Sequence, residues 1–207
     1  MAVLPMFPLG TVLLPGGVLP LHVFEPRYRQ LVIDCLADDT GDPEFGVTMI
    51  ERGWEVGGGD TRTDVGVVAR MVQVEALPDG RYAVVAVGTR RIRVLAWLPD
   101  DPYPLADVDD WPDDEPDANG LAARVDAMRG RLGAVFELAV RTGDLRDVPE
   151  LAVSDDALLA SYHLAGLAPI GPADRFRLLS TRSPAERLDL LTEVLDDVEA
   201  MLRFRLT

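Results

Sequence analysis

The spacing of apolar side chains changes once along the chain, and this change constrains the fold most strongly. Up to about residue 108, short apolar runs alternate with turn residues, which is typical of a small barrel or a curled sheet. Beyond residue 120, apolar residues recur every three or four positions, which indicates amphipathic helices. The sequence therefore predicts an α+β protein in which a β-rich part precedes a helical part.

Residues 99–120 separate the two patterns and contain five prolines and eight aspartates. Such a composition disfavours both helices and central strands, so we interpret this stretch as a linker. The predicted domains are a β domain at residues 1–116 and an α-helical bundle at residues 117–207.

The β-rich part contains several strand candidates and one helix. The strand candidates are residues 18–23, 45–50, 66–74, 81–87 and 92–97. Residues 78–80, Pro-Asp-Gly, should form a β-hairpin turn, because an Asp-Gly pair can supply positive φ angles. The inserted helix should begin at Pro26, since proline suits a first helical position, and should end within residues 38–41.

In the helical part, a first helix is expected from Leu121 to about Gly143, and a second should begin with Ser154 as its cap. Ser183 and Glu186 match a capping box that opens a terminal helix. That helix carries an apolar stripe formed by Leu188, Leu191, Leu195, Val198 and Leu202. Packing onto the preceding helices is the simpler interpretation of the stripe, and a coiled-coil dimer is the alternative.

The charged residues exclude several classes of function. Thirty-five acidic against twenty basic residues give a formal charge of -15, which repels nucleic-acid phosphates. The densest basic cluster, Arg90, Arg91 and Arg93, is interpreted as a solvated strand edge. All basic residues are arginines, and without lysine the chain cannot form a phosphate-gripping P-loop, a Ser-Lys dyad or a Schiff base. We therefore expect no nucleic-acid partner and no ATPase or Ser-Lys protease activity.

Cysteine and histidine are too few for a Cys/His zinc site or an internal disulfide, which leaves only carboxylates as metal ligands. Cys35 is the single cysteine, and His22 and His163 are the two histidines, so neither an internal disulfide nor a Cys/His zinc set can form. Cys35 lies in an apolar stretch and is expected to be a buried hydrophobe rather than a nucleophile. We expect no cofactor and no metal.

The N-terminal region carries neither a membrane span nor a basic signal-peptide start. Prolines and glycines interrupt its apolar residues well before the roughly 18 that a span requires. We therefore expect a cytoplasmic protein without a membrane partner.

Three strings near the N-terminus are characteristic of one known family. They are Phe-Pro-Leu at residues 7–9, Leu-Pro-Gly-Gly at 14–17 and Leu-Pro-Leu-His-Val-Phe-Glu-Pro-Arg-Tyr at 19–28, and further matches follow at residues 45–47, 65–69, 79–82, 88–94 and 103–104. Across residues 1–110 the chain resembles the N-terminal substrate-binding domain of Lon proteases. The resemblance implies a PUA-like β-barrel followed by a helical bundle.

In Lon proteases this domain precedes an ATPase module and a Ser-Lys protease module, and the chain, which ends at Thr207, is expected to contain neither. The resemblance implies a non-catalytic module that binds unfolded or degron-bearing polypeptides, with a separate protease as a possible partner. We expect a monomer or a weak homodimer.

Large apolar residues around the proline-rich turn are the candidate peptide-binding residues. Most of them should belong to the core, and a minority should stay exposed as a binding patch. The candidates are Leu14, Pro15, Val18, Leu19, Phe24, Tyr28 and Trp54. His22, Glu25 and Arg27 could in principle do acid-base chemistry, but strand alternation separates His22 from Glu25, so we assign these three structural roles.

Two other functions remain open on the sequence alone. A small-molecule-binding or enzymatic protein could use a cleft between the barrel and the bundle, in which case a closed pocket lined by carboxylates with shifted pKa values should exist. RNA binding is suggested only by the PUA-like architecture and is opposed by the net charge.

Overall fold

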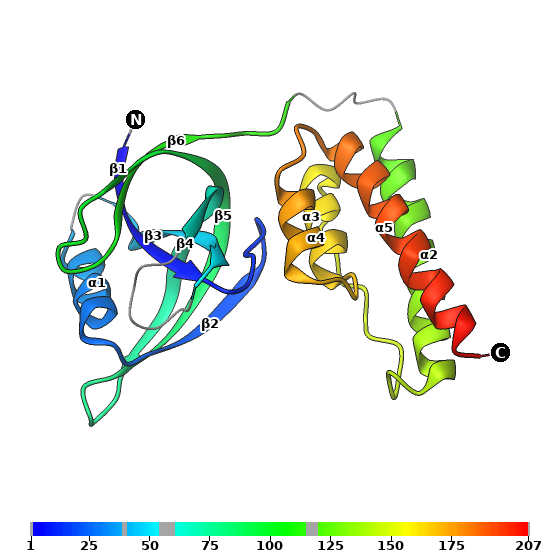
Figure 1. The fold of residues 1–207 in the computed structure, drawn as a ribbon, viewed down its shortest axis with the longest axis horizontal. Coiled ribbons are helices and arrows are strands. Elements are labelled where there is room, and N and C mark those ends of the chain that lie inside the picture. The colour runs from blue at the N-terminus through cyan, green and yellow to red at the C-terminus, as the bar shows by residue number, and fades with distance from the viewer. Residues whose placement is uncertain (1, 39–40, 54–60, 115–119, 207) are drawn as a thin grey trace. The chain divides into compact units, whose positions relative to one another are not determined.

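The computed structural model describes residues 2–38, 41–53, 61–114 and 120–206. It is an α+β structure with two compact units, residues 1–112 and 113–207 (Figure 1). The predicted domain boundary between residues 116 and 117 lies outside the described residues.

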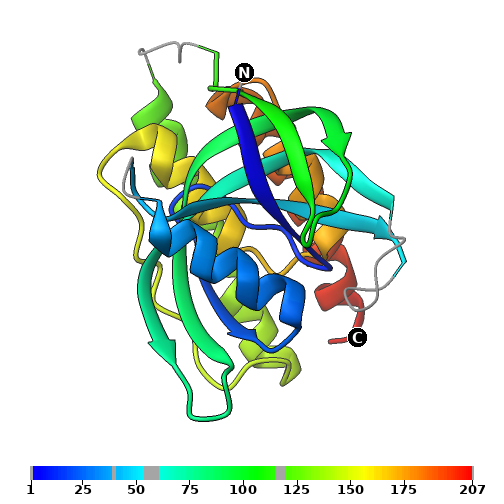
Figure 2. The same cartoon turned by 90° about the vertical axis from the view of Figure 1, so that its left-hand side faces the viewer.

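The first unit is built around one mixed sheet. Its elements are β1 (Ala2–Leu9), β2 (Val18–Val23), α1 (Pro26–Ala37), β3 (Glu44–Arg52), β4 (Thr61–Ala76), β5 (Tyr82–Leu98) and β6 (Leu105–Asp110). In the described residues the strand order is β2-β5-β4-β3-β1-β6, and β6 also pairs with β5. Five strands therefore form a closed ring of pairings, and β2 is joined to this ring through β5 (Figure 2).

The length of β5 allows it to pair with three strands. Its first residues, Tyr82 to Val87, pair with β2, and its last residues, Ile92 to Leu98, pair with β6. Along most of its length β5 also pairs with β4, in a register that is interrupted by bulges at Val68/Ala69 and Met71/Gln73. Bulges increase the local twist of a strand, which helps such long strands to curl.

All five predicted strand segments lie within β2 to β5, apart from Arg81, which precedes β5. Helix α1 begins at Pro26, as predicted. The interpretation of residues 99–120 as a linker is wrong for β6. Ala106 and Val108 alternate into the core and are fully or nearly buried, and β6 pairs with both β1 and β5. Asp107 between them and Asp109 and Asp110 after them made the stretch look like a linker by composition.

The interior of the first unit lies inside the ring and beneath α1. One cluster of buried side chains comprises Met6, Val68, Ile92, Val94, Ala106 and Val108. Helix α1 buries Tyr28, whose ring stacks on Phe7 with 3.9 Å between the ring centroids. Tyr103 donates a hydrogen bond of 2.9 Å to Asp34 of α1, and this bond further fastens the helix to the sheet.

A β-bulge at two glycines leads the chain into β2. The Gly16 amide donates to the Gly88 carbonyl at 2.8 Å, and the Gly88 amide donates to the Gly17 carbonyl at 2.9 Å. Gly16 has a φ of 76°, a conformation in which a side chain is strained, and this pattern is that of a glycine-first bulge. A Cβ atom on Gly88 would lie 2.4 Å from the Leu14 carbonyl oxygen, so the approach of the two segments requires glycine there.

We predict that Gly88→Ala lowers the free energy of unfolding of the protein by about 2–3 kcal/mol, because the methyl group would push two backbone segments apart. Chemical denaturation monitored by circular dichroism measures the change. Gly41→Ala is the matched control in the same unit, since a Cβ at Gly41 meets nothing within 4 Å. Equal stability of the two variants would contradict the close packing at Gly88.

The second unit is helical. Its elements are α2 (Leu121–Thr142), α3 (Ala157–Leu167), α4 (Pro172–Leu179) and α5 (Pro184–Phe204). Helix α5 packs against the other three, so the interpretation that its apolar stripe packs onto the preceding helices accounts for the stripe. None of the helices in the described part of the chain is long and apolar enough to span a membrane.

The predicted helix ends are confirmed in two places and corrected in one. Gly143 ends α2 with a φ of 82°, and the Ser183 side chain accepts the Glu186 amide at the start of α5. Ser154 is not the cap of α3. Asp156 caps it by accepting the Leu159 amide at 2.8 Å, while Ser154, two residues before Asp156, accepts the Asp156 amide.

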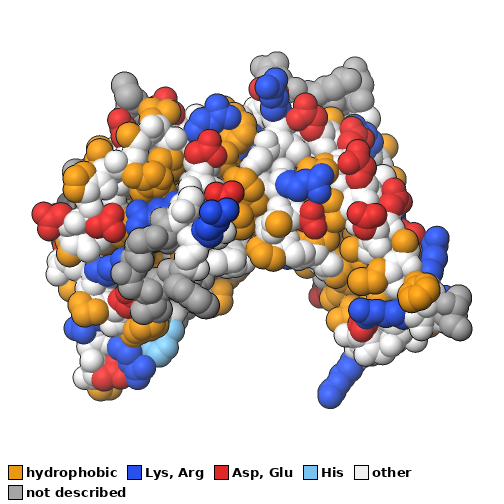
Figure 3. All heavy atoms as spheres, in the orientation of Figure 1, with side chains coloured by type: hydrophobic (Ala, Val, Ile, Leu, Met, Phe, Trp, Pro, Cys, Tyr) orange, Lys and Arg blue, Asp and Glu red, His pale blue; other side chains and the backbone are white. Residues whose placement is uncertain are grey.

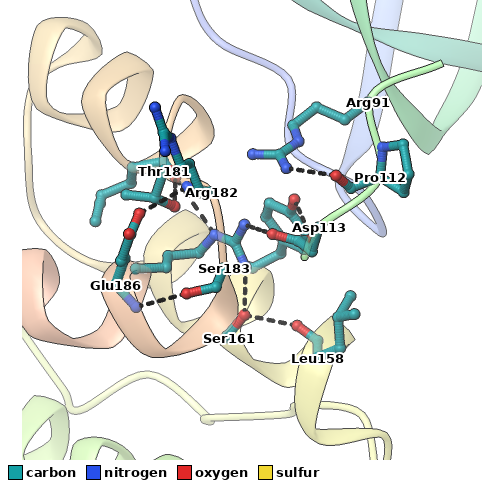
Figure 4. A network of polar contacts seen from close by, with 12 residues as sticks. Arg91, Pro112, Asp113, Leu158, Ser161, Thr181, Arg182, Ser183 and Glu186 are labelled. Carbon is teal, nitrogen blue, oxygen red and sulfur yellow. Dashed lines mark hydrogen bonds and ion pairs between the residues drawn. The ribbon is translucent and has the colours of Figure 1, made fainter. Parts of the chain in front are cut away.

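A buried arginine joins α3, α4, α5 and the first residue of the unit. Arg187 is fully buried; its Nη1 donates to Ser161 at 2.8 Å and its Nε donates to the Leu178 carbonyl at 3.3 Å. The remaining nitrogen pairs with Asp113, whose other oxygen accepts from Tyr162 at 2.7 Å (Figure 4). The guanidinium also stacks on the Tyr162 ring, 3.5 Å from its centroid. Asp113 is thus bound by both Arg187 and Tyr162.

We predict that Asp113→Asn destabilises the protein by about 3–5 kcal/mol, because it leaves the buried Arg187 charge uncompensated. Thermal and chemical unfolding measure this loss. The control is Asp189→Asn, which removes an exposed ion pair with Arg124 and should cost less than about 1 kcal/mol. A similar, small effect of both substitutions would show that the buried pair is not required.

Candidate functional site

The structure separates the predicted peptide-binding residues into exposed and buried sets. Val18 and Phe24 present their side chains to solvent, with exposed fractions of 66% and 53%. Four others, Leu14, Pro15, Leu19 and Tyr28, are buried. Trp54 lies outside the described residues.

One of the two exposed candidates, Val18, belongs to a larger face formed by β2 and β5. Along β2, Val18, Pro20 and His22 are exposed, whereas Leu19 and Val23 are buried. Residues directly opposite each other in an antiparallel pair project from the same face, so the partners of the exposed residues complete this surface. The partners on β5 are Val87, Val85 and Ala83, all partly exposed.

We call these six residues the β2–β5 face: Val18, Pro20, His22, Ala83, Val85 and Val87. Phe24 follows at the end of β2 and is also exposed. The face is mostly apolar and has the width of two strands. Sequence analysis missed Pro20, Val85 and Val87, because the register that places them beside Val18 is set by the glycine bulge and not by either strand alone.

The outer edge of β2 is not covered by another strand in the described part of the chain, where β2 pairs with β5 alone. An edge strand carries main-chain N–H and C=O groups that an extended polypeptide can pair with. The apolar face and the open edge therefore lie on the same strand.

The interpretation of the arginine cluster as a solvated strand edge is wrong for Arg91, which is buried, whereas Arg93 is exposed. Its side chain is 2% exposed and donates to the carbonyls of Trp111 and Pro112 at 3.0 and 3.2 Å. The guanidinium groups of Arg91 and Arg93 both lie over the Trp111 ring, 4.1 and 4.2 Å from its centroid. Burial here is possible because two carbonyls and an aromatic ring replace water around the charge.

Other arginines pair with carboxylates. Arg90 binds Glu44 and Asp110, and Arg131 of α2 binds Asp196 and Glu199 of α5. On the face drawn in Figure 3, basic and acidic side chains are interspersed instead of gathering into a basic patch. This distribution does not favour a phosphate backbone.

Cys35 has the environment of a core residue. It is buried in α1, and its thiol donates to the Glu44 carbonyl at 3.3 Å. Burial, and then the nearby carboxylates of Asp34 and Asp38, raise the pKa of the thiol to about 12. A thiol with so high a pKa carries almost no thiolate at neutral pH and is a poor nucleophile.

The remaining candidates for acid-base or metal chemistry do not converge. Glu25 forms an ion pair with Arg27 at 3.1 Å, and His22 lies on the β2–β5 face. His163 accepts the Ser154 amide with Nδ1 at 3.1 Å, and burial lowers its pKa. Among the described residues, no group of three or more His, Cys, Asp or Glu side chains is arranged to hold a metal ion.

Comparison with known proteins gives a consistent family assignment. Residues 3–197 match the family model described as the ATP-dependent protease La (LON) substrate-binding domain. Lon protease 2 of Herpetosiphon aurantiacus is 32% identical over 93% of this chain, and Lon protease 2 of Myxococcus xanthus is 31% identical over 97%. The chain spans about a quarter of the length of these relatives, 23% and 24% respectively.

Solved structures show the same fold. A Lon N-terminal domain protein from Xanthomonas campestris superposes with a TM-score of 0.65 and 30% identity, covering 93% of this chain and 98% of that one. The N-terminal domain of a Mycobacterium avium complex Lon protease, at 23% identity, has a TM-score of 0.63 over 93% of this chain and 97% of that one. The protein therefore belongs to the LON substrate-binding domain family.

Proposed function

We propose that this protein is a non-catalytic module that binds unfolded or degron-bearing polypeptides through the β2–β5 face. The observation that carries the proposal is the exposed apolar surface on the open edge strand of a LON substrate-binding domain. Phe24, exposed at the end of β2, would extend the contact with the bound segment.

The strength of such binding follows from the apolar area that a segment would bury. A segment that buries about 400 Å² of apolar surface gains roughly 10 kcal/mol, of which association and ordering consume a large part. A dissociation constant near micromolar remains. Weak binding of this kind suits a module that must release its client.

Charge favours some clients over others. The chain has a formal charge of -15, so segments flanked by basic residues are attracted and segments flanked by acidic residues are repelled. The same charge repels RNA and DNA. The preference for basic flanks should weaken as added salt screens the charges.

We propose that hydrolysis of the bound polypeptide is left to a separate protease, with this protein acting as an adaptor. The absence of lysine from the 207 residues supports this division, because neither a Ser-Lys dyad nor an ATP-binding P-loop can be assembled without it. The high pKa of the Cys35 thiol is consistent with a role that needs no nucleophile.

We also propose that the first unit is a β-barrel of the PUA-like type and that the second unit is a helical bundle. The closed ring of pairings among β5, β4, β3, β1 and β6 supports the first assignment. The packing of α5 against α2, α3 and α4 supports the second.

We predict that Val18→Ser combined with Phe24→Ser weakens binding of a fluorescent apolar peptide with arginine flanks by about 10-fold, because two exposed apolar contacts are lost. Fluorescence anisotropy at low and high salt measures the affinity. Val3→Ser is the control, because Val3 is similarly exposed, at 57%, but lies on β1 outside the face. Unchanged affinity in the double variant, or an equal loss in the control, would refute this placement of the site.

A further inference from the structure

The alternation of hydrogen bonds along β2 identifies which of its main-chain groups are open. The Gly88 amide donates to the Gly17 carbonyl, so Gly17 and Gly88 form a hydrogen-bonded pair. Hydrogen-bonded and outward-facing residues alternate along an antiparallel strand. Leu19, Leu21 and Val23 therefore direct their main-chain groups toward β5, and Val18, Pro20 and His22 direct theirs toward the open edge.

Pro20 provides an independent check of this assignment. Proline has no N–H to give to a ladder, and inside a sheet it is tolerated on an edge strand with its nitrogen directed outward. Pro20 is opposite Val85 and occupies one of the outward positions, as the alternation requires. Both arguments place the same three residues at the edge.

The open edge therefore has an uneven set of hydrogen-bonding groups. Val18 and His22 each offer an N–H and a C=O, whereas Pro20, midway between them, offers a C=O alone. The side chains of the same three residues form the exposed half of the apolar face. A segment added to β2 as a further strand would satisfy both sets at once.

We propose that β2 binds its polypeptide by strand addition, in which the backbone of the segment pairs with Val18 and His22 and Pro20 withholds one hydrogen bond. This inference rests on the proposed function. The occupant is an extended polypeptide segment, because substrates of a protease's substrate-binding domain are polypeptides and because the edge groups match a peptide backbone.

Pro20 also limits how tightly and for how long a polypeptide stays bound to β2. A continuous apolar edge would pair with a second copy of this chain or retain a client too long, and prolines on edges prevent such pairing. Because Pro20 lacks an N–H, an added strand forms one hydrogen bond fewer, binds more weakly and dissociates sooner. Pro20 thus acts as a gatekeeper in the middle of the site.

The experiment uses the full chain and an apolar peptide of about nine residues with arginine flanks. In a series of otherwise identical peptides, each amide in turn is replaced by an ester, which removes one N–H and preserves the shape. Strand addition predicts that affinity falls about 2- to 10-fold at every second position over the paired stretch and is unchanged at the positions between. Side-chain contact alone predicts no such alternation.

A second arm tests the gatekeeper. Pro20→Val restores the missing donor with a side chain of similar apolar size, and we expect it to tighten peptide binding by about 2- to 10-fold or to make the free protein self-associate in sedimentation experiments. Pro99→Val, an exposed proline outside β2, is the control and should change neither quantity.

The outcomes separate the two proposals. Peptide binding that tolerates esters at all positions, or a Pro20→Val variant that neither binds the peptide more tightly nor self-associates, would overturn strand addition and leave the proposed apolar binding face unaffected. Absence of binding by any of the peptides would overturn the proposed function itself.

Discussion

The pair of hydrogen bonds between the Gly16–Gly17 turn and Gly88 fixes the register of β2 on β5, and the proposed site depends on this register. Side chains alternate strictly along a strand, so a slip of one residue would move Leu19 and Val23 to the solvent and Val18 and His22 into the core. It would also turn Pro20 toward β5, where a missing N–H breaks the ladder. A contact between glycines at the start of β2 thereby determines which side chains and which main-chain groups are exposed at the proposed site.

The second unit depends on a different kind of constraint. Arg187 is a charge without access to water, and it is compatible with the fold because Asp113, Ser161, the Leu178 carbonyl and the Tyr162 ring surround it. These groups come from three separate segments, since Ser161 and Tyr162 both lie on α3, Leu178 lies on α4 and Asp113 precedes the helices. The arginine therefore specifies how α3, α4 and α5 meet around the start of the unit, in addition to the apolar packing between them.

Sequence reasoning succeeded where the signal is local. The change of apolar period, the proline start of α1, the glycine end of α2 and the Ser183 cap are each determined by residues a few positions apart, and the structure shows all of them. The prediction of Ser154 as a cap was wrong by two residues, because three consecutive residues able to cap a helix, Ser154, Asp155 and Asp156, precede α3 and the helix uses Asp156. The resemblance of residues 1–110 to the substrate-binding domain of Lon proteases was likewise recognisable from short contiguous strings of residues.

The features that were missed depend on long-range partners. Strand β6 was not predicted, because its sequence is rich in aspartate and its burial depends on pairing with β1 and β5. The burial of Arg91 follows from Trp111, twenty residues away, and that of Arg187 from Asp113, which is 74 positions distant. Which of the candidate apolar residues stay exposed follows from the β2–β5 register. No single strand contains that information.

The most direct test of the binding site is amide hydrogen exchange, measured by NMR with and without a saturating apolar peptide. The peptide is expected to slow exchange at the outward amides of Val18 and His22 and to shift the resonances of Val85 and Val87, while Leu19 and Leu21, already paired with β5, change little. Protection confined to α2 to α5, or to strands other than β2 and β5, would contradict it.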